Sequence, residues 1–539
     1  MRRAVRRAAA LVGIGIAAVL VAAAGGAGAR PAQTRVPGVS ADRQQEIGAA
    51  AAEFGVPAPL LVALSAALTG WGTDADPAVA GGHGLFRLAD GPPRLDGRGT
   101  GSTGAGPATG RDPASSTLAE AAELLRRPVD RVRDDPLDNA RGAAALLRRY
   151  AQEATGGPLP RTLAGWYGAV ARFGTGDAMT GRAVADDVFA LLRSGAAPAV
   201  VSSQRFSLPA RRDAVLPAAP GTGRGLDGSS PVQCPVELSC RFVPAAAYTP
   251  AERTAVTATR TTVVTETPAG YTATIAVAQR ASTRWSPHYV VRARDGAVTQ
   301  TVRLEDIAWH AGNPTVNASS VGIAVERGTG GPSPAAYRSV SRLLRWLGGR
   351  GLVLNRAHVL GGGEVAGAPL RLDPAWDWGR VLAAAGAPLR AGAFRADRVV
   401  TVAAPGLLLR SAPADGAEVL PGQPAVGRSL AVAERRGEWT AVWYGGRLAW
   451  LRDPAGRLTL PGDGERITPV PGRAEVSVFG SVAGPEPVAL AARMQAGQAY
   501  LLLDPAAVRA PTGAYLAVGF GERIGFVRAE DVALADLTG

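Results

Sequence analysis

The sequence predicts a multidomain fold with an all-α N-terminal domain, a central α/β domain and all-β modules at the C-terminus. Its 539 residues are too many for one hydrophobic core, and a hydrophobic content of 47% is ample for several. Apolar residues recur at helical spacing between positions 41 and 200, whereas short alternating segments separated by glycine and proline follow Gly392. These patterns exclude a largely disordered chain and predict three to four domains.

The helical domain is expected over residues 41–198. Gly55-Val56-Pro57 and the glycine-rich stretch 81–110 interrupt it. The expected helices are Asp42–Phe54, Pro59–Leu68, Ser116–Leu125, Asn139–Ala154 and Ala183–Leu192. Residues 199–233 are rich in Pro, Gly, Ser and Arg and lack sustained periodicity, which indicates a linker.

The central domain is expected over 234–392 and combines both kinds of pattern. Val298–Val302 and Val321–Val325 suit strands, and Ala335–Leu347 is an amphipathic helix. Two β modules are expected after it, over 396–460 and 467–539.

The first 29 residues predict export. Four arginines within Met1–Arg7 precede an uncharged run that ends at the small residues Ala27-Gly28-Ala29. A signal peptide over residues 1–29, cleaved after Ala29, is expected, and a retained membrane anchor through residues 8–29 is the alternative. In an exported chain, the close pair Cys234 and Cys240 indicates one disulfide. A metal site is not expected there, because no further Cys or His lies nearby in the sequence.

All 58 basic residues are arginine, and the formal net charge is +13. No interleaving of aromatic and basic residues and no groove-reading motif occurs, so nucleic acid is not an expected partner. An acidic wall polymer would suit an exported basic protein. The alternative is that the arginines reflect GC-rich coding bias and general solubility.

A series of motifs runs in fixed order from Thr261 to Trp378. The motifs are Trp285-Ser286-Pro287-His288-Tyr289, Asp295-Gly296, Trp309-His310-Ala311-Gly312-Asn313, Val321-Gly322-Ile323, Asn355-Arg356-Ala357-His358 and Asp373-Pro374. Together they resemble zinc-dependent N-acetylmuramoyl-L-alanine amidases of the peptidoglycan-recognition type. The resemblance implies a mixed sheet flanked by helices and peptidoglycan as the partner.

The sequence departs from this family at the residues that carry the chemistry. Thr265 stands where the family has its first zinc histidine, Gly362 stands at the second, and Ala324 replaces the catalytic glutamate. Asp373 alone keeps a ligand position. A catalytic zinc ion needs three protein ligands and an open position for water. No cofactor is therefore expected, and zinc is expected only if the site is rebuilt.

A rebuilt site could use other residues. The chain has four histidines, His83, His288, His310 and His358. Zinc held by His310, His358 and Asp373 is one alternative. The other is that these histidines are partly buried and hydrogen-bonded to neighbours.

Seven residues are candidates for lining a sugar–peptide cleft, because aromatic faces stack on sugars and polar side chains pair with peptide groups. They are Trp285, His288, Tyr289, Trp309, His310, Asn313 and Asn317. The alternative is that they are core aromatics and turn asparagines.

Two further resemblances flank the amidase-like segment. Glu53-Phe54-Gly55-Val56-Pro57, Gly81-Gly82-His83-Gly84 and Trp166-Tyr167-Gly168 resemble a lysozyme-like domain, in which the acid would fall at Leu68. Leucine cannot donate a proton, and Asp74 and Asp76 have the surroundings of a solvated turn. Gly437-Glu438-Trp439-Thr440 and its neighbours resemble a bacterial SH3-like barrel, a module that commonly binds wall peptides.

The leading hypothesis is an exported cell-wall protein that binds peptidoglycan without efficient hydrolysis, a pseudoenzyme. The alternatives are an active amidase with a rearranged zinc site and a regulator of another wall hydrolase. The expected location is outside the cell at the wall, either secreted or membrane-anchored.

Overall fold

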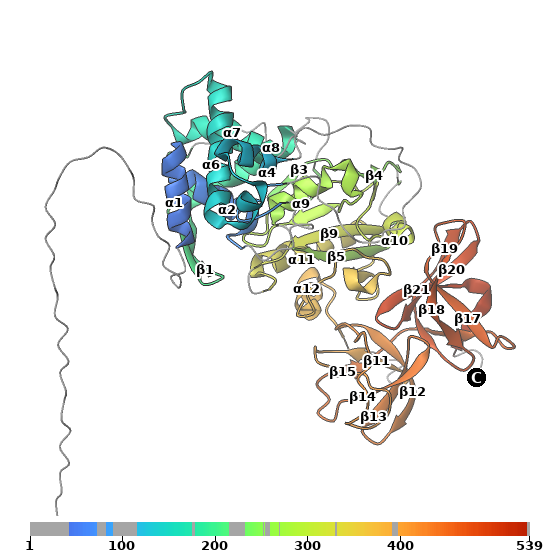
Figure 1. Cartoon of the computed structure of the whole chain (residues 1–539). Helices are drawn as coiled ribbons and strands as arrows, with labels where there is room; N and C mark the ends of the chain where they lie inside the picture. Colours follow the sequence, from blue (N-terminus) through green and yellow to red (C-terminus); the bar gives the residue numbers. More distant parts are fainter. Residues whose placement is uncertain are drawn as a thin grey trace, which may run out of the picture. The chain divides into compact units, whose positions relative to one another are not determined.

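A computed structural model describes residues 42–72, 82–89, 116–174, 178–214, 232–251, 253, 259–268, 270–328, 331–390 and 397–535 (Figure 1). Residues Asp42–Gly539 form one compact unit. The predicted signal peptide or anchor, 1–29, lies outside the described residues. Among the described helices, none is long and apolar enough to cross a membrane.

The N-terminal region is helical, as predicted. Its elements are α1 (Arg43–Phe54), α2 (Ala58–Thr69), α4 (Thr117–Leu125), α5 (Val129–Asp134), α6 (Pro136–Thr155), η1 (Leu163–Trp166), α7 (Tyr167–Gly174) and α8 (Ala178–Ser194). Asp42 caps α1 by accepting a hydrogen bond from the Gln44 amide, and Gly55 ends it in the left-handed conformation at φ 67°. The apolar faces meet in one core around Trp166 and Phe189.

Part of the predicted linker is folded. Residues 196–208 form a hairpin of β1 (Ala196–Val201) and β2 (Gln204–Leu208). Phe206 stacks on Trp71 with ring centroids 5.2 Å apart, which ties the hairpin to the helical core. The prediction of a linker beginning at residue 199 is therefore wrong over its first ten residues. Composition alone missed the hairpin because its stability comes from this long-range contact.

The central domain is built on a six-stranded mixed sheet with the order β10-β5-β9-β6-β7-β3. The strands are β3 (Cys240–Phe242), β5 (Thr261–Thr267), β6 (Tyr289–Val291), β7 (Val298–Gln300), β9 (Ser320–Glu326) and β10 (Val359–Gly361). Only β6 and β7 pair antiparallel; the other neighbours are parallel. A short pair, β4 (Tyr248–Thr249) and β8 (Ile307–Ala308), lies outside it.

Helices cover both faces of this sheet. The side chains of Val264, Ile323 and Val325 pack with α11 (Pro334–Gly348) and α12 (Trp378–Ala385) in one core cluster. Residues of α9 (Tyr271–Ala278) pack against the opposite face. The short helix α10 (Pro314–Ser319) leads into β9. The predicted mixed sheet with flanking helices is confirmed.

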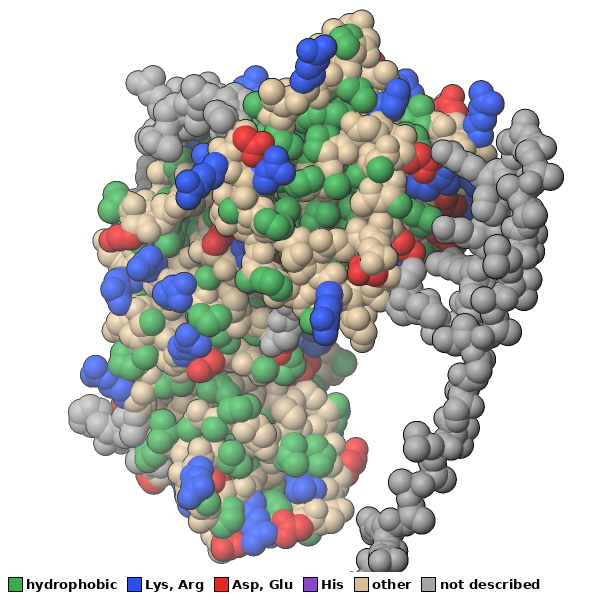
Figure 2. Space-filling model, turned by 90° about the vertical axis from the view of Figure 1, so that its left-hand side faces the viewer, with side chains coloured by type: hydrophobic (Ala, Val, Ile, Leu, Met, Phe, Trp, Pro, Cys, Tyr) green, Lys and Arg blue, Asp and Glu red, His purple; other side chains and the backbone are tan. Residues whose placement is uncertain are grey.

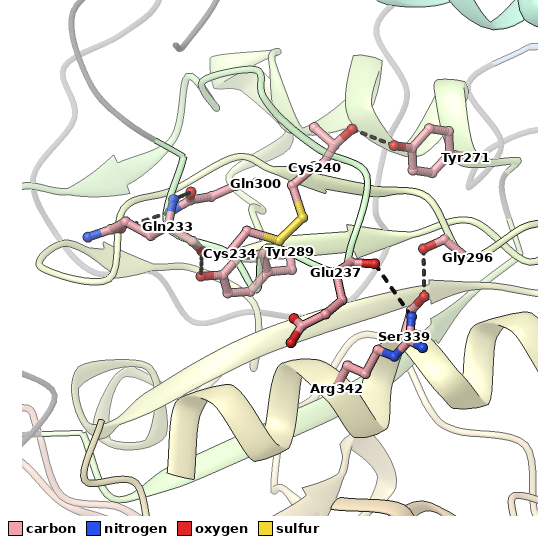
Figure 3. Close-up of a disulfide and its surroundings, with 11 residues drawn as sticks. Gln233, Cys234, Glu237, Cys240, Tyr271, Tyr289, Gly296, Gln300, Ser339 and Arg342 are labelled. Carbon is pink, nitrogen blue, oxygen red and sulfur yellow. Dashed lines mark hydrogen bonds between the residues drawn. A yellow bond between two sulfur atoms is a disulfide. The ribbon is translucent and has the colours of Figure 1, made fainter. Parts of the chain in front are cut away.

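The predicted disulfide is present. Cys234 and Cys240 are bonded, and the loop they close lies beside the buried Tyr289 (Figure 3). The Tyr289 hydroxyl donates to the Gln233 carbonyl oxygen at 2.6 Å. Both cysteines pack against the cluster under α11, so the disulfide fixes the entry of the chain into the central domain.

The C-terminal region contains two antiparallel sheets. The first has the order β14-β13-β12-β11-β15, with β11 (Val399–Val402), β12 (Ser429–Arg436), β13 (Trp439–Tyr444), β14 (Arg447–Arg452) and β15 (Thr459–Pro461). The second has the order β18-β17-β21-β20-β19-β16-β22. Its strands are β16 (Arg466–Pro469), β17 (Glu475–Ser481), β18 (Val488–Gln495), β19 (Tyr500–Ala510), β20 (Gly513–Phe520), β21 (Arg523–Arg528) and β22 (Val532–Leu534). An all-β C-terminal region is confirmed.

A buried ion-pair network joins α8 to the central sheet. The Asp187 carboxylate lies 3.1 Å from an Arg241 nitrogen and 2.5 Å from an Arg292 nitrogen. Both guanidinium groups also stack over the Tyr271 ring. Burial alone would raise the pKa of Asp187, but Arg241 and Arg292 outweigh it and hold that pKa below its usual value.

Candidate functional site

Thr265 and Gly362, the positions at which zinc histidines would be expected, lie next to each other in the structure. The space between them is filled. Gly362 follows β10, which pairs with β5 next to Thr265. A Cβ atom at Gly362 would overlap the Leu370 carbonyl oxygen and would lie 2.7 Å from Thr265 Cγ2. The glycine is therefore required by close packing, and no side chain fits at this position.

The predicted position of the catalytic glutamate lies in the same packed region. Ala324 is the register partner of Thr265 across β5 and β9, so both side chains share one face of the sheet. Ala324 is fully buried in an apolar cluster with Val277 of α9 and Leu370. The methyl group of Ala324 packs in this apolar cluster and cannot act as a base.

Asp373 is half-buried and shapes a turn. Its Oδ1 atom accepts a hydrogen bond from the Ala375 amide at 2.7 Å. The neighbouring carboxylate of Glu266 is buried and pairs with Arg327 at 3.2 Å. Burial raises the pKa of Glu266, Arg327 opposes that rise, and the charge of Asp373 adds to it. One carboxylate at the predicted ligand positions does not fit a three-ligand zinc site.

The histidines have protein partners. His310 is 1% exposed, and its Nε2 lies 2.9 Å from the Ser320 hydroxyl. His288 is buried and accepts the Gly322 amide at Nδ1, 3.0 Å away. The Nδ1 atom of His358 lies 2.8 Å from Asn355 Oδ1. Burial lowers the pKa of His310 to about 3, so this ring is neutral at physiological pH.

The residues of the predicted alternative zinc site have separate neighbours. Within the described ranges, no three His, Cys, Asp or Glu side chains converge in an arrangement that could hold a metal ion. His358 faces Asp504 of the last β sheet at 3.8 Å, whereas His310 faces Ser320. The structure therefore does not bring His310, His358 and Asp373 together.

Most of the predicted cleft residues are buried and serve the fold. Trp285 and Tyr289 are at most 3% exposed. Asn313 caps α10, and its Nδ2 donates to the Gly480 carbonyl oxygen of β17 at 2.7 Å. Asn317 accepts the Ala311 amide at 2.8 Å. Together with His288 and His310, these residues do not line an open cleft in this structure, because their side chains are buried.

The last β sheet covers this part of the central domain. The Thr315 hydroxyl accepts the Val482 amide at 2.8 Å and the Ala483 amide at 2.9 Å. Val263, Val316 and Leu360 share an apolar cluster with Tyr515 and Phe526 of the last sheet. The sequence did not indicate this contact, because it joins segments about 170 residues apart.

Trp309 is the exception among the predicted cleft residues. Its side chain is partly exposed, and its indole N–H donates to the Thr249 hydroxyl at 2.9 Å. That bond fixes the ring while part of its surface faces solvent. Trp309 is therefore the predicted cleft residue that remains available to a ligand.

Leu68, the predicted position of the lysozyme-like acid, lies where α2 meets the central domain. It is 5% exposed. The Thr272 hydroxyl donates to the Ala67 carbonyl oxygen at 3.1 Å, and a Cβ atom at Gly270 would overlap the Leu68 carbonyl oxygen. This position is packed against α9. Asp74 and Asp76 lie outside the described residues.

Sequence reasoning missed a cleft at the carboxyl ends of β5, β6 and β9. Its volume is about 910 Å³, and its lining includes Arg292, Arg294, Glu326 and Arg327 together with residues of α2 and β1. Ligand sites of open α/β sheets commonly lie at such strand ends. No signal in the sequence indicated this cleft, because its lining comes from segments that lie far apart along the chain.

The sheet and its helices define an α/β domain with a mixed six-stranded sheet. Residues 255–376 match the family model described as N-acetylmuramoyl-L-alanine amidase.

Solved structures that are similar to part of this chain include an endolysin and two amidase-related proteins. A mutant endolysin from Bacillus subtilis is 21% identical and covers 27% of this chain and 97% of its own, with a TM-score of 0.23. The N-acetylmuramyl-L-alanine amidase AmiD from E. coli is 22% identical and covers 26% and 62%, with a TM-score of 0.22. AmpD is 25% identical and covers 27% and 93%, with a TM-score of 0.21. No curated protein matches the chain.

Proposed function

We propose that this chain is an exported cell-wall protein that binds peptidoglycan and does not hydrolyse it efficiently. The observation that carries this proposal is the filled space at Gly362, where the Leu370 carbonyl oxygen and the Thr265 methyl group occupy the place of a metal ligand. Ala324 on the same face packs in an apolar cluster with Val277 and Leu370, which suits a domain that holds no catalytic zinc ion. A domain of this family without its reaction centre keeps recognition as its remaining role.

Export is supported by the N-terminal sequence and by the disulfide. The arginine-rich start and uncharged run have the organisation of an export signal. Disulfides persist mainly in oxidising compartments outside the cytosol. The Cys234–Cys240 bond therefore agrees with a location at the wall.

The proposed wall contact centres on Trp309. Its ring is held by the bond to Thr249 and is partly exposed, which suits stacking on a sugar or peptide plane. The first C-terminal sheet, β11 to β15, resembles an SH3-like module in sequence and would add a second contact with the wall. Binding at one contact would raise the effective concentration of the wall at the other. Trp443 is a weaker candidate, because it packs between the two C-terminal sheets.

Purified protein dialysed against excess zinc and then against buffer is expected to retain far less than one zinc ion per chain. It is also expected to release no stem peptides from peptidoglycan. Elemental analysis and chromatography of the digest measure both. The proposal fails if stoichiometric zinc remains and a chelator stops a measurable release of peptides.

Trp309→Ala is expected to weaken retention on insoluble peptidoglycan by about three- to tenfold, the range of one aromatic contact. Co-sedimentation at several wall concentrations measures the change. Trp346→Ala is the matched control, because Trp346 is also partly exposed but lies on α11 under Arg350. Equal retention of both variants and the native protein would contradict the assignment of Trp309.

A further inference from the structure

The cleft at the carboxyl ends of β5, β6 and β9 lies between the central domain and the helical domain. One wall comes from segments that follow these strands, including Pro268, Ala293 and Gly328. The other comes from the C-terminal end of α2, from α8 and from β1. The volume of about 910 Å³ is that of a site for a ligand of several hundred daltons.

The charged lining of this cleft is predominantly positive. Four arginines, Arg87, Arg292, Arg294 and Arg327, face one carboxylate, Glu326. Figure 2 shows arginines among acidic and hydrophobic side chains on the face that it draws.

The four arginines differ in how well they are paired. Arg292 is engaged by Asp187 and Asp295, and Arg327 by Glu266. Arg294 has only a 3.5 Å contact from Nε to Asp295. Arg87 has a buried Nε atom without a hydrogen-bond partner among the described residues. Burial lowers the pKa of Arg87 to about 10, so this cation lacks the stabilisation that a nearby anion would give.

Glu326 does not supply that anion. Its Oε1 accepts the Tyr271 amide at 2.7 Å, and its Oε2 accepts the Ala293 amide at 2.8 Å. Both carboxylate oxygens are therefore committed to holding the start of α9 and the end of β6. Burial raises the pKa of Glu326 in spite of these bonds, which further limits its negative charge.

The wall that comes from the helical domain carries Arg87 and is otherwise mostly apolar. Ala66 and Trp71 contribute from the end of α2, Leu191 from α8, and Ala199 and Val201 from β1. A ligand for this cleft needs acidic groups for the arginines and aliphatic surface for the apolar part of the helical wall. Inorganic phosphate has no aliphatic surface, whereas a short acidic peptide has both.

We propose that this cleft binds a short acidic peptide, with carboxylates on Arg87 and Arg294 and aliphatic groups on the alanine- and valine-lined wall. The guanidinium fork pairs with a carboxylate in a bidentate arrangement, which favours this chemistry. The site is separate from the packed zinc positions and from Trp309, and it does not depend on the wall binding proposed above.

The test is isothermal titration of the full chain with acetyl-Ala-Glu-Ala-Glu, with its neutral glutamine amide analogue, and with inorganic phosphate. Binding of the acidic peptide alone is expected. Arg87→Gln and Arg294→Gln should each weaken it about tenfold, the value of one charge-assisted contact. Arg457→Gln, which removes an exposed arginine of the β module, is the matched control and should have no effect.

Ala199→Phe gives a second, independent variant, because it keeps every arginine and fills the apolar side of the cleft. It should abolish binding while the thermal unfolding of the protein stays near that of the native chain. The proposal is overturned if the acidic peptide does not bind. It is equally overturned if the neutral analogue or phosphate binds as tightly, or if Arg457→Gln weakens binding as much as the cleft variants. Loss of peptide binding with intact wall retention would leave the proposed function standing.

Discussion

Replacing Gly362 with alanine is expected to lower the free energy of unfolding by about 1 to 3 kcal/mol, the range for overpacking a filled core. The added methyl group would overlap the Leu370 carbonyl oxygen and press on Thr265 Cγ2 at 2.7 Å. Backbone atoms cannot rotate away as a flexible side chain can, so β10 or the segment around Leu370 has to shift. Urea unfolding followed by tryptophan fluorescence measures the change.

Gly363→Ala is the matched control for this prediction. The next residue in the same short helix has no neighbour closer than 3.9 Å to its added Cβ, and that neighbour is the flexible Arg371 side chain. The free energy of unfolding of the Gly363→Ala variant should therefore equal that of the native protein or exceed it slightly. If Gly362→Ala unfolds at the same urea concentration as Gly363→Ala, the space at position 362 is open and the argument against a metal ligand there loses its basis.

The same packing determines what back-mutation can achieve. Histidines at positions 265 and 362 would restore the ligand types of the family, yet the second imidazole has no space between β5 and the Leu370 backbone. The backbone around Leu370 would therefore have to shift before a histidine at position 362 could be accommodated.

Local patterns predicted the elements, because helices and strands follow from spacing within a few residues. The expected helix Ala335–Leu347 appears as Pro334–Gly348, and the expected disulfide is formed. The departures at Thr265, Ala324 and Gly362 were also visible in the sequence. Their consequence, which is a filled core rather than an empty site, was not visible in the sequence. It depends on where the Leu370 carbonyl oxygen lies.

The candidate binding residues were the least predictable part. Asn313 looked like a ligand contact because it follows an aromatic motif, but it caps α10 and bonds to Gly480 of a sheet that lies far along the chain. The cleft around Arg87 and Arg294 brings together segments more than 200 residues apart. No local pattern indicates such a contact, and only the packing of α2 and β1 beside the strand ends creates it.

Asp187→Asn is expected to destabilise the protein by about 3 kcal/mol, because it leaves two buried guanidinium groups without their shared carboxylate. Arg241 loses its ion-pair partner, whereas Arg292 keeps Asp295 at 2.8 Å. Both arginines remain over the Tyr271 ring, so their positive charges stay close to each other. Calorimetry and urea unfolding measure the loss, and Asp130→Asn, at a carboxylate whose side chain is 76% exposed, should change stability by less than about 0.5 kcal/mol.

The pH dependence separates this charge effect from a simple loss of packing. The pKa of Asp187 in the folded protein lies below the value of about 3.9 for an unfolded aspartate. Its contribution is therefore complete above about pH 4 and is lost as the pH falls through the lower folded value. The difference in stability between native protein and Asp187→Asn should shrink in that acid range and stay constant from pH 5 to 8. A difference that persists unchanged into strong acid would mean that the network acts through shape rather than through charge.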